Sequence, residues 1–520
     1  MARINTNVSS IIAQSKLANT QQELGLRLER LSTGLRINRG KDDPAGLIIS
    51  ERLRSDIRGV ETGVKNTQRA SSMISTTEGA LAEVSDLLNS IRSLIVEAAS
   101  TGARSDDERR ANQLQIDSAI ESITRVSNTA SYGSLKLLNG QLDYTTSGVQ
   151  TSAISTLKVN NASRIDQANL QVTVDVIASA QYGALLYNGA TTPAGVLLSS
   201  MNLEIAGPTG VQTVNLASGI TLAQVVTAVN SFRGLTGVEA SLINNNASSG
   251  LVFRSIEYGS DAFVSVRRLG GPSNPSSDSW DMYRFNNDEP VVFGSPFDWA
   301  TLIAANDIVP ATRDVGRDVS ALINGNLAEG RGLKAILNKP TLGIEADLAE
   351  SVATDPALAA FSFYITGGGA LFQLGGDVTA LQQATIGIAS VSASKLGGSL
   401  VNGSLQYLSS LKDGEGNSLR ESIARGGDFT ASQSILAKAM DEVTFIRGRL
   451  GAFERNVLEP NQRALQSQFE NLTASESLIR DADFAVETSK LTRAQILSSA
   501  GTSVLSLANQ QSEQVLQLLG

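Results

Sequence analysis

The chain has 520 residues, which is long enough for about three or four domains. It contains no histidine and no cysteine, so it offers no imidazole base, no thiolate nucleophile, no disulfide and no zinc site with His or Cys ligands. Of the common catalytic groups, only carboxylate, Lys, Tyr and Ser/Thr side chains remain. The formal net charge is −9 and no segment is basic enough to predict a nucleic-acid interface. We expect no cofactor and no metal.

The sequence carries no recognisable targeting or membrane segment. Residues 1–22 lack an apolar core of signal-peptide length, and no run of about 18 apolar residues occurs in the chain. We therefore expect neither Sec-dependent export nor membrane insertion. The absence of cysteine fits the cytosol, or a route out of the cell that needs no disulfides.

Proline divides the chain into two flanks and a middle. Nine of the 11 prolines lie between Pro193 and Pro356, which leaves only Pro44 and Pro460 in the flanks. Because proline removes a backbone donor and breaks helices, the flanks can form long helices and the middle cannot. The middle is also acidic, with 13 Lys and Arg against 21 Asp and Glu over residues 141–395. We expect this part to be the most exposed to water.

The first flank predicts three helices separated by two breaks. A leucine stripe with steps of four and three residues predicts core packing of Leu24, Leu28, Leu31 and Leu35. The turn-forming run NRGKDDPAG at 38–46 ends this helix. No proline interrupts residues 45–100, which predicts a helix roughly 80 Å long. Ser105 and Glu108 have capping-box spacing for a third helix that ends near Asn128, and 132–140 predicts a short strand and turn.

The middle predicts small β-rich units. Residues 214–266 run from a strand through a short helix at 222–232 into two strands of alternating pattern and one further strand. This order predicts a compact α+β unit. Residues 270–310 combine proline, tryptophan and many Asn and Asp residues, and their sequence predicts no particular fold.

The last flank and both chain ends are helical by pattern. Residues 426–475 and 481–519 are interrupted only by Pro460. Lys16 is the only charged residue between 4 and 22, and Glu513 is the only one between 494 and 520. Apolar or small residues recur at heptad spacing, with Gln511 filling one position: Ile4, Val8, Ile11, Ser15 and Ala18, and Leu497, Gly501, Val504, Ala508, Val515 and Leu518. Isolated helices with such small seams are marginal in water, so we expect them to require a partner.

Two partners fit this pattern. The ends could pack only on each other within one chain, because few of their faces carry charge. Alternatively, they could assemble with other copies into a large structure. Assembly would explain the Ser, Gln and Asn side chains around the seams, since buried charge is costly whereas amides and hydroxyls can hydrogen-bond between subunits. We favour assembly.

Several segments resemble bacterial flagellin. They are ARINTN at 2–7, LSTGLRINRGKDDPAGLIIS at 31–50, IRSLIVEAASTG at 91–102, ITRVSNTASYGSLKLLNG at 123–140 and LIRDADFAVETSKLTRAQILSSAGTSVLSLANQ at 478–510. The resemblance covers roughly 1–140 and 396–520, in matching order at both ends. In the middle, VNLASGITLAQVVTAVNSF at 214–232 resembles the small insertion module of flagellins and hook-associated proteins, and 372–393 resembles the segment before the family's C-terminal core.

The resemblance implies a multidomain fold. An α-helical coiled-coil or bundle core would be formed by both termini, with inserted β-rich (α+β) outer domains. Residues 1–43 and 481–520 would form the terminal helices of the inner filament core, and 44–149 and 396–480 a helical outer core domain. Residues 150–395 would form a variable, surface-exposed β-rich insertion that includes the insertion module at 211–268.

The resemblance also implies function and partners. Flagellins are structural subunits, not enzymes, that polymerise through their N- and C-terminal helices into the hollow flagellar filament used for swimming. They leave the cell through the flagellar type III export apparatus, with an export chaperone at the C-terminal helix, and they meet hook-associated and cap proteins. We therefore expect a secreted homopolymer in the extracellular flagellum.

Three alternatives are weaker. A hook-filament junction (hook-associated) protein shares the helical termini, but the match across KDDPAG and the C-terminal segment favours the filament. An enzyme on a flagellin-like core could use carboxylates of the middle, although acidic loop residues usually serve solvation and a metallopeptidase insert would need histidine; the candidates are Asp278, Asp281, Asp288, Glu289 and Asp298. Arginines at 27, 30, 36, 39, 52, 54 and 58 alternate with acidic residues, so we expect exposed or subunit-bridging ion pairs there rather than a nucleic-acid site.

Many flagellins are recognised by an animal Toll-like receptor through the long core helix. The corresponding region would include Arg92, Leu94 and Val96, which match the recognised pattern and whose ordinary role would be helix surface and packing between subunits. Ser90 and Gln115 stand where that pattern has arginine and glutamate. Because the loss of two charged anchors weakens an interface, we expect weak receptor activation or none.

Overall fold

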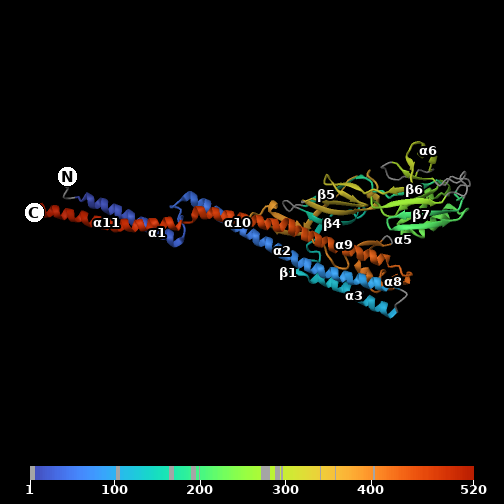
Figure 1. Cartoon of the computed structure of the whole chain (residues 1–520), viewed down its shortest axis with the longest axis horizontal. Coiled ribbons are helices and arrows are strands. Elements are labelled where there is room, and N and C mark those ends of the chain that lie inside the picture. The colour runs from blue at the N-terminus through green and yellow to red at the C-terminus, as the bar shows by residue number, and fades with distance from the viewer. Residues whose placement is uncertain are drawn as a thin grey trace. The chain divides into compact units, whose positions relative to one another are not determined.

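A computed structural model divides the chain into two compact units (Figure 1). The terminal unit comprises Met1–Glu78, Phe372–Ala384 and Arg447–Gly520, and the middle unit comprises Gly79–Leu371 and Thr385–Ile446. The structure describes residues 6–100, 106–162, 169–188, 195–197, 199–270, 281–286, 293, 297–339, 341–357, 359–401 and 404–519.

Long helices occupy both flanks, as the sequence predicts. They are α1 (Val8–Thr33), α2 (Pro44–Ala98), α3 (Asp106–Thr129), α8 (Leu419–Ala424), α9 (Thr430–Phe453), α10 (Glu459–Arg480) and α11 (Phe484–Leu519). Asn7 caps α1 by accepting a hydrogen bond from the Ser10 N–H, and Gly34 ends it at φ 73°, a conformation that glycine adopts without steric cost. Pro44 begins α2, where its missing N–H leaves no helical bond unmade. The predicted cap Ser105 lies outside the described residues.

Pro460 distorts the helical path of the last flank but does not end it. It lies in the first turn of α10, and a π-helical stretch, η6 (Glu454–Leu458), joins α9 to α10. A proline in a regular helix clashes with the carbonyl four residues earlier, here that of Asn456. The wider π turn accommodates this clash, so the two helices continue into each other.

The helices of the middle unit bury regular apolar stripes. Buried residues recur at steps of three and four in α2, at Leu81, Val84, Leu88, Ile91 and Ile95, and in α3, at Ile116, Ile120 and Ile123. After α3, the strands β1 (Ser131–Tyr132) and β2 (Leu135–Lys136) pair across a turn at Gly133, which confirms the predicted strand and turn.

Two antiparallel sheets enclose the first β core of the middle unit. One has the order β16-β15-β5-β20-β3 and the other β17-β18-β19-β4. The strands are β3 (Tyr144–Ser147), β4 (Ile154–Ala162), β5 (Leu170–Ala178), β15 (Ser320–Ile323), β16 (Asn326–Leu327), β17 (Glu329–Arg331), β18 (Lys334–Asn338), β19 (Leu342–Leu348) and β20 (Phe361–Gly368). Alternate residues such as Ile344, Ala346 and Leu348 are buried, because successive side chains of a strand point to opposite faces.

A second pair of sheets encloses the other β core. The orders are β13-β12-β6-β10-β9 and β14-β11-β7-β8. The strands are β6 (Ala184–Tyr187), β7 (Met201–Gly207), β8 (Gly210–Leu216), β9 (Val238–Leu242), β10 (Leu251–Ser255), β11 (Phe263–Leu269), β12 (Met282–Phe285), β13 (Ile308–Pro310) and β14 (Arg313–Val315). Helix α4 (Leu222–Asn230) begins with a capping box between Thr221 and Gln224 and packs into this core. The predicted α+β unit is confirmed, and with it the coarse fold of helical flanks around a β-rich middle.

An aromatic cluster covers the other face of the sheet that contains β6. Trp299, the first residue of α6 (Trp299–Ala304), is 8% exposed, and its ring lies 5.1 Å from that of Phe297 and 5.6 Å from that of Tyr283. Its Nε1 donates to the Ser249 carbonyl at 2.8 Å. The aromatic side chains of this cluster cover the apolar residues of that sheet face, so we expect their burial to contribute to the stability of the middle unit.

Replacing Trp299 by phenylalanine should destabilise the middle unit by about 2 kcal/mol, since it shrinks the buried ring and leaves the Ser249 carbonyl without its donor. Urea unfolding of the full chain, followed by far-UV circular dichroism, measures the change. The Leu327→Ala variant alters a residue that is 64% exposed and should change stability by less than about 0.5 kcal/mol. Equal stabilities of the two variants would contradict the role of the cluster.

Candidate assembly interface

The two ends of the chain form a helix pair in the terminal unit. Helices α1 and α11 lie side by side with both termini at the same end, so the pair is antiparallel (Figure 1). Near the termini, Asn7 Nδ2 donates to the Ala508 carbonyl at 2.9 Å, and Ser10 Oγ donates to Asn509 Oδ1 at 2.8 Å. These bonds join residues about 500 positions apart and fix which turns of the two helices face each other.

The facing sides of α1 and α11 carry heptad seams. Buried and half-buried residues recur at steps of three and four, at Ser10, Ala13, Leu17, Thr20, Leu24, Arg27 and Leu31, and at Glu487, Leu491, Ala494, Ser498, Gly501, Leu505 and Ala508. Gly501 permits a close approach, because a Cβ there would lie 3.2 Å from Leu17 Cδ1. Small residues such as Ala13, Ala494 and Gly501 alternate with the leucines of both seams, so apolar burial alone specifies the register weakly. Polar contacts at the two ends of the pair can supply the missing specificity.

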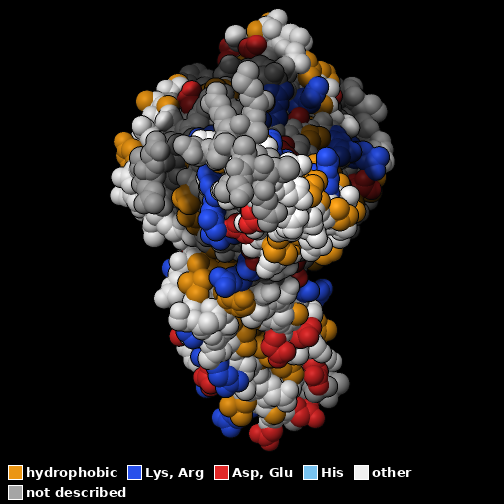
Figure 2. Space-filling view, turned by 90° about the vertical axis from the view of Figure 1, so that its left-hand side faces the viewer, with side chains coloured by type: hydrophobic (Ala, Val, Ile, Leu, Met, Phe, Trp, Pro, Cys, Tyr) orange, Lys and Arg blue, Asp and Glu red, His pale blue; other side chains and the backbone are white. Residues whose placement is uncertain are grey.

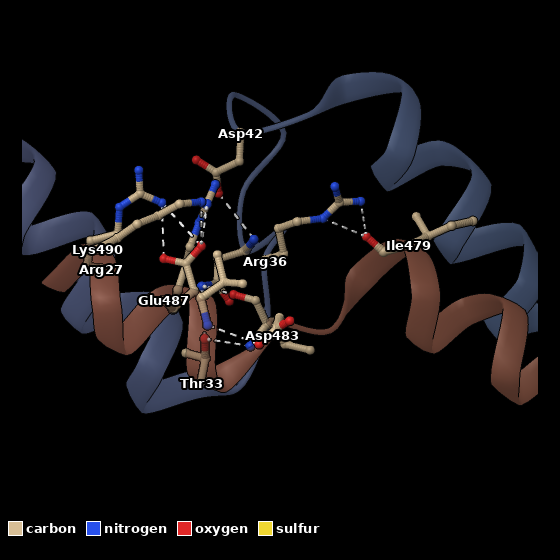
Figure 3. Close-up of polar contacts among 12 residues, drawn as sticks. Arg27, Thr33, Arg36, Asp42, Ile479, Asp483, Glu487 and Lys490 are labelled. Carbon is tan, nitrogen blue, oxygen red and sulfur yellow. Dashed lines mark hydrogen bonds and ion pairs between the residues drawn. The ribbon is translucent and has the colours of Figure 1, made fainter.

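Glu487 is the strongest of these polar contacts. Among the described residues, it is the only charged residue that is buried, with 4% of its surface exposed. Its carboxylate accepts hydrogen bonds from Arg27 at 3.0 and 3.2 Å and from Arg30 at 3.3 Å, and Lys490 Nζ lies 3.8 Å away (Figure 3). Burial raises the pKa of the Glu487 carboxyl, but the Arg27 hydrogen bond and the charges of Arg27, Arg30 and Lys490 outweigh burial and hold the pKa below its ordinary value. The carboxylate therefore remains ionised at neutral pH.

The non-helical segments that follow α1 and α10 lie against each other. We call this contact the joint. The Ala482 N–H donates to the Gly34 carbonyl at 2.9 Å, and the Arg36 N–H donates to the Arg480 carbonyl at 2.6 Å. The Arg36 guanidinium also donates to the Ile479 carbonyl, at 2.5 Å from Nη2 and 3.1 Å from Nε (Figure 3). Backbone N–H and carbonyl groups that have no partner within their own helix thus form hydrogen bonds across the joint.

The residues predicted at the subunit interface fall on two faces of the pair. Gly501 and Ala508 lie in the seam toward α1, whereas Val8, Ile11, Ser15, Ala18, Leu497 and Val504 are exposed. Ile4 and the side chains of Val515 and Leu518 lie outside the described residues. Leu28, Phe484 and Val486 are exposed near the joint end of the pair, and seven further exposed apolar residues form what we call the outer stripe: Val8, Ile11, Ile12, Ile496, Leu497, Val504 and Leu507. A shallow groove on α11, lined by Ser489, Thr492, Arg493, Ile496 and Leu497, runs along this face.

The other predicted residues are also placed by the structure. Of the leucine stripe, Leu24, Leu31 and Leu35 are half-buried, but Leu28 is 50% exposed. In the region resembling the receptor patch, Arg92 and Val96 are exposed and Leu94 is half-buried, and Ser90 and Gln115 are exposed as well.

The carboxylates weighed for catalysis do not converge in the described part of the chain. Asp298 caps α6 by accepting hydrogen bonds from the Ala300 and Thr301 N–H groups, and Asp281 is exposed. Asp278, Asp288 and Glu289 lie outside the described residues. No group of three or more acidic side chains there is placed to hold a metal ion. Among the described residues, no helix is both long enough and apolar enough to cross a membrane.

The sequence predicts ion pairs for Arg27 and Arg30 but does not indicate that a residue at the other end of the chain is their partner. The partner, Glu487, is 460 and 457 positions away. A signal was available, because Glu487 stands on the heptad line that continues through Ala494, Gly501 and Ala508 at steps of seven. Because a buried carboxylate needs a partner of opposite charge, Glu487 on a heptad line of otherwise small, uncharged residues predicts a cationic side chain opposite it.

Three family models match the chain. The bacterial flagellin N-terminal helical region matches residues 4–143, the bacterial flagellin C-terminal helical region matches 434–519, and the flagellin hook IN motif matches 202–257. Together they cover more than half of the chain. The two helical regions include α1, α2 and α3 at one end and α10 and α11 at the other.

Named relatives align over nearly the whole chain. Flagellin from Salmonella choleraesuis is 28% identical over 541 residues, and B-type flagellin from Pseudomonas aeruginosa is 27% identical over 524; each alignment covers 99% of both chains. Solved structures are more distant. FlgL from Xanthomonas campestris covers 82% of this chain and 99% of its own at 12% identity and a TM-score of 0.26, and the flagellar cap protein FliD from Bdellovibrio bacteriovorus covers 38% and 95% at 15% identity and a TM-score of 0.25. Similarity at these TM-scores does not establish a shared fold.

A helix pair built from both ends of one chain, with a β-rich middle inserted between them, marks a structural protein of the bacterial flagellum. The chain belongs to the bacterial flagellin family and is a subunit of the flagellar filament.

Proposed function

We propose that this chain polymerises through α1 and α11 into a hollow filament, in which the helix pairs of many copies form the inner core. The observation that carries this proposal is the outer stripe. Helices α1 and α11 already satisfy each other along their seams, yet Val8, Ile11 and Val504 remain 50%, 56% and 55% exposed. Completing the burial of each such side chain would contribute roughly 1 kcal/mol. A neighbouring pair presents the same stripe, so helix-on-helix contacts between copies can cover it.

Seeded polymerisation tests this function. Purified chain is mixed with short fragments of its own filaments and examined by electron microscopy, and we expect filaments of micrometre length. The alternative, a hook-filament junction protein, would add only a short ring. A chain that stays monomeric in the presence of seeds would contradict the filament proposal.

We further propose that residues 1–43 and 481–520 form the inner filament core, 44–149 and 396–480 a surrounding helical layer, and 150–395 the outer surface. Deleting residues 150–370 should then preserve assembly and reduce filament diameter, because the deletion removes both β cores and leaves α1, α10 and α11 intact. Electron microscopy and sedimentation of the deletion variant measure both quantities. A variant that keeps its helical circular dichroism but cannot polymerise would show that the outer domains are part of the assembly contacts.

Export is the last element of the proposal. We infer a secreted, extracellular protein that leaves through the flagellar type III apparatus and meets hook-associated and cap proteins at the filament ends. Before assembly, Ile496, Leu497 and Leu507 of α11 are 63%, 46% and 59% exposed, and such a surface promotes aggregation. A chaperone with an apolar groove would cover it, as grooves bind amphipathic helices elsewhere.

The chaperone should be captured from cell extract by residues 481–520 alone. The apolar face of α11 supplies the contacts, so a segment with Ile496, Leu497 and Leu507 replaced by serine should capture at least about tenfold less. Quantitative mass spectrometry of the two captures measures the difference. Equal capture by a chain that lacks residues 481–520 would sink the idea.

A further inference from the structure

A short hairpin of the chain presents two apolar side chains to solvent. Strands β21 (Ala370–Gln373) and β22 (Gln383–Ile386) form a two-stranded sheet. In the loop between them, which we call the hairpin tip (residues 374–382), Val378 is 85% exposed and Leu381 is 99% exposed. These are the largest exposed fractions among the large hydrophobic residues that the structure describes. The tip belongs to the terminal unit, which also carries α1 and α11.

The hairpin tip is held in shape by its polar side chains. Gln382 Oε1 accepts from the Asp377 N–H at 2.6 Å, and the Leu374 N–H donates to the Gln382 carbonyl at 2.8 Å. Gln373 Nε2 donates to the carbonyls of Gly375 and Asp377, at 3.1 and 2.7 Å. The polar groups are thus used inside the loop while the apolar side chains point outward.

The hairpin tip also rests on two helices of the terminal unit. At Gly59 of α2, a Cβ would lie 3.2 Å from the Gly376 carbonyl oxygen, and at Gly63 a Cβ would lie 3.2 Å from the Leu374 carbonyl oxygen. Asn461 of α10 donates to the same Leu374 carbonyl at 3.0 Å. Backbone that is packed this closely against helices moves little. Val378 and Leu381 therefore project from a firm support.

We propose that the hairpin tip is an assembly contact, in which Val378 and Leu381 insert into an apolar site on a second copy of this chain. Two side chains bury far less than the roughly 1,200 Å² that a stable contact with a separate protein requires. In a polymer, each copy makes many contacts at the same time. The small area buried by two side chains is therefore enough to strengthen assembly. On the face drawn in Figure 2, hydrophobic side chains lie in small groups among charged ones, which favours several small contacts over one large docking surface. The inference rests on the proposed function and extends the interface beyond α1 and α11.

Polymerisation of a variant with Val378→Ser and Leu381→Ser tests the proposal. The concentration of free chain in equilibrium with filaments should rise about ten- to a hundredfold, because both side chains lose their apolar contact. Matched controls are Val211→Ser and Leu327→Ser, which alter residues of the middle unit that are 63% and 64% exposed; they should change this concentration by less than about twofold. A tip variant that folds normally by circular dichroism and polymerises like the unaltered chain overturns the proposal.

A cross-linking experiment identifies the occupant. Because the chain has no cysteine, Leu381→Cys creates a single thiol that can carry a photoactivated cross-linker. Illumination should produce covalent chain-to-chain dimers in filaments and none in dilute monomer, whereas Leu327→Cys should give none in either. Products confined to one chain in well-formed filaments would overturn the inference and leave the proposed function standing. A chain that never polymerises would overturn both.

Discussion

Removing residues 1–22, or residues 497–520, should abolish filament formation while the middle unit stays folded. The first truncation removes Ser10 and Leu17 from the seam together with the Asn7 hydrogen bond to α11, and the second removes Gly501 and Ala508 from the seam. The helix that remains then has no partner, and an isolated helix with so few large apolar residues is marginal in water. When this helix becomes disordered, the residues of the outer stripe that it carries become disordered too. Sedimentation and electron microscopy measure the loss of filaments.

The fold of the truncated chains can be followed separately. Trp299 is buried in the aromatic cluster of the middle unit, and the other tryptophan of the sequence, Trp280, is 19 positions before it, so tryptophan emission during urea unfolding is used to follow the middle unit. We expect unfolding midpoints close to that of the full chain. The deletion of residues 150–370 is the control, since it removes far more of the chain and should still polymerise. Normal filaments from both truncations would refute the assignment of α1 and α11 to the core.

Replacing Glu487 by alanine should have the next largest effect. The variant leaves Arg27 and Arg30, whose side chains are 16% exposed, without the only buried carboxylate that the described part of the structure offers them. Breaking a buried ion pair in this way costs about 3 kcal/mol. If α1 and α11 order together as the chain polymerises, this cost appears as a rise of about a hundredfold in the concentration of free chain at equilibrium with filaments. Sedimentation at a series of total concentrations measures it.

An exposed ion pair supplies the matched control. Lys65 and Glu61 lie 2.6 Å apart on α2, with side chains that are 62% and 50% exposed. Pairs of this kind contribute at most about 1 kcal/mol, so Glu61→Ala should change the equilibrium concentration only a few-fold. Similar effects of Glu61→Ala and Glu487→Ala would show that the buried cluster has no special role.

Acidification should act through the same carboxylate. The pKa of Glu487 in the folded state lies below its ordinary value of 4.5, so its ion pairs stabilise the folded pair above pH 4.5. The stabilisation is lost as the pH falls through the lower, folded-state pKa. Filaments of the unaltered chain should therefore weaken more steeply below about pH 4 than those of Glu487→Ala, which has already lost this contribution.

Local rules made much of the fold predictable from the sequence alone. The absence of proline between 45 and 100 predicted a helix that the structure places at Pro44–Ala98, and the strand and helix patterns of 214–266 predicted β8, α4, β9, β10 and β11 in order. The motifs at both ends identified the family. These features could be predicted because proline, capping residues and side-chain period act on neighbours in the chain.

The faces of the terminal helices were decided only by the tertiary structure. Gly501 and Ala508 can share a seam with Leu497 and Val504 or with Ser498 and Leu505, and both sets keep heptad spacing. The sequence favoured the first set; in the structure the second set turns toward α1, and Leu497 and Val504 are left exposed. The pairing of Glu487 with Arg27 and Arg30, the joint and the hairpin tip were likewise decided by the tertiary structure. Each of these features depends on contacts between residues that are far apart in the sequence. A periodic pattern specifies which residues share a stripe on a helix, but it does not specify which surface covers that stripe.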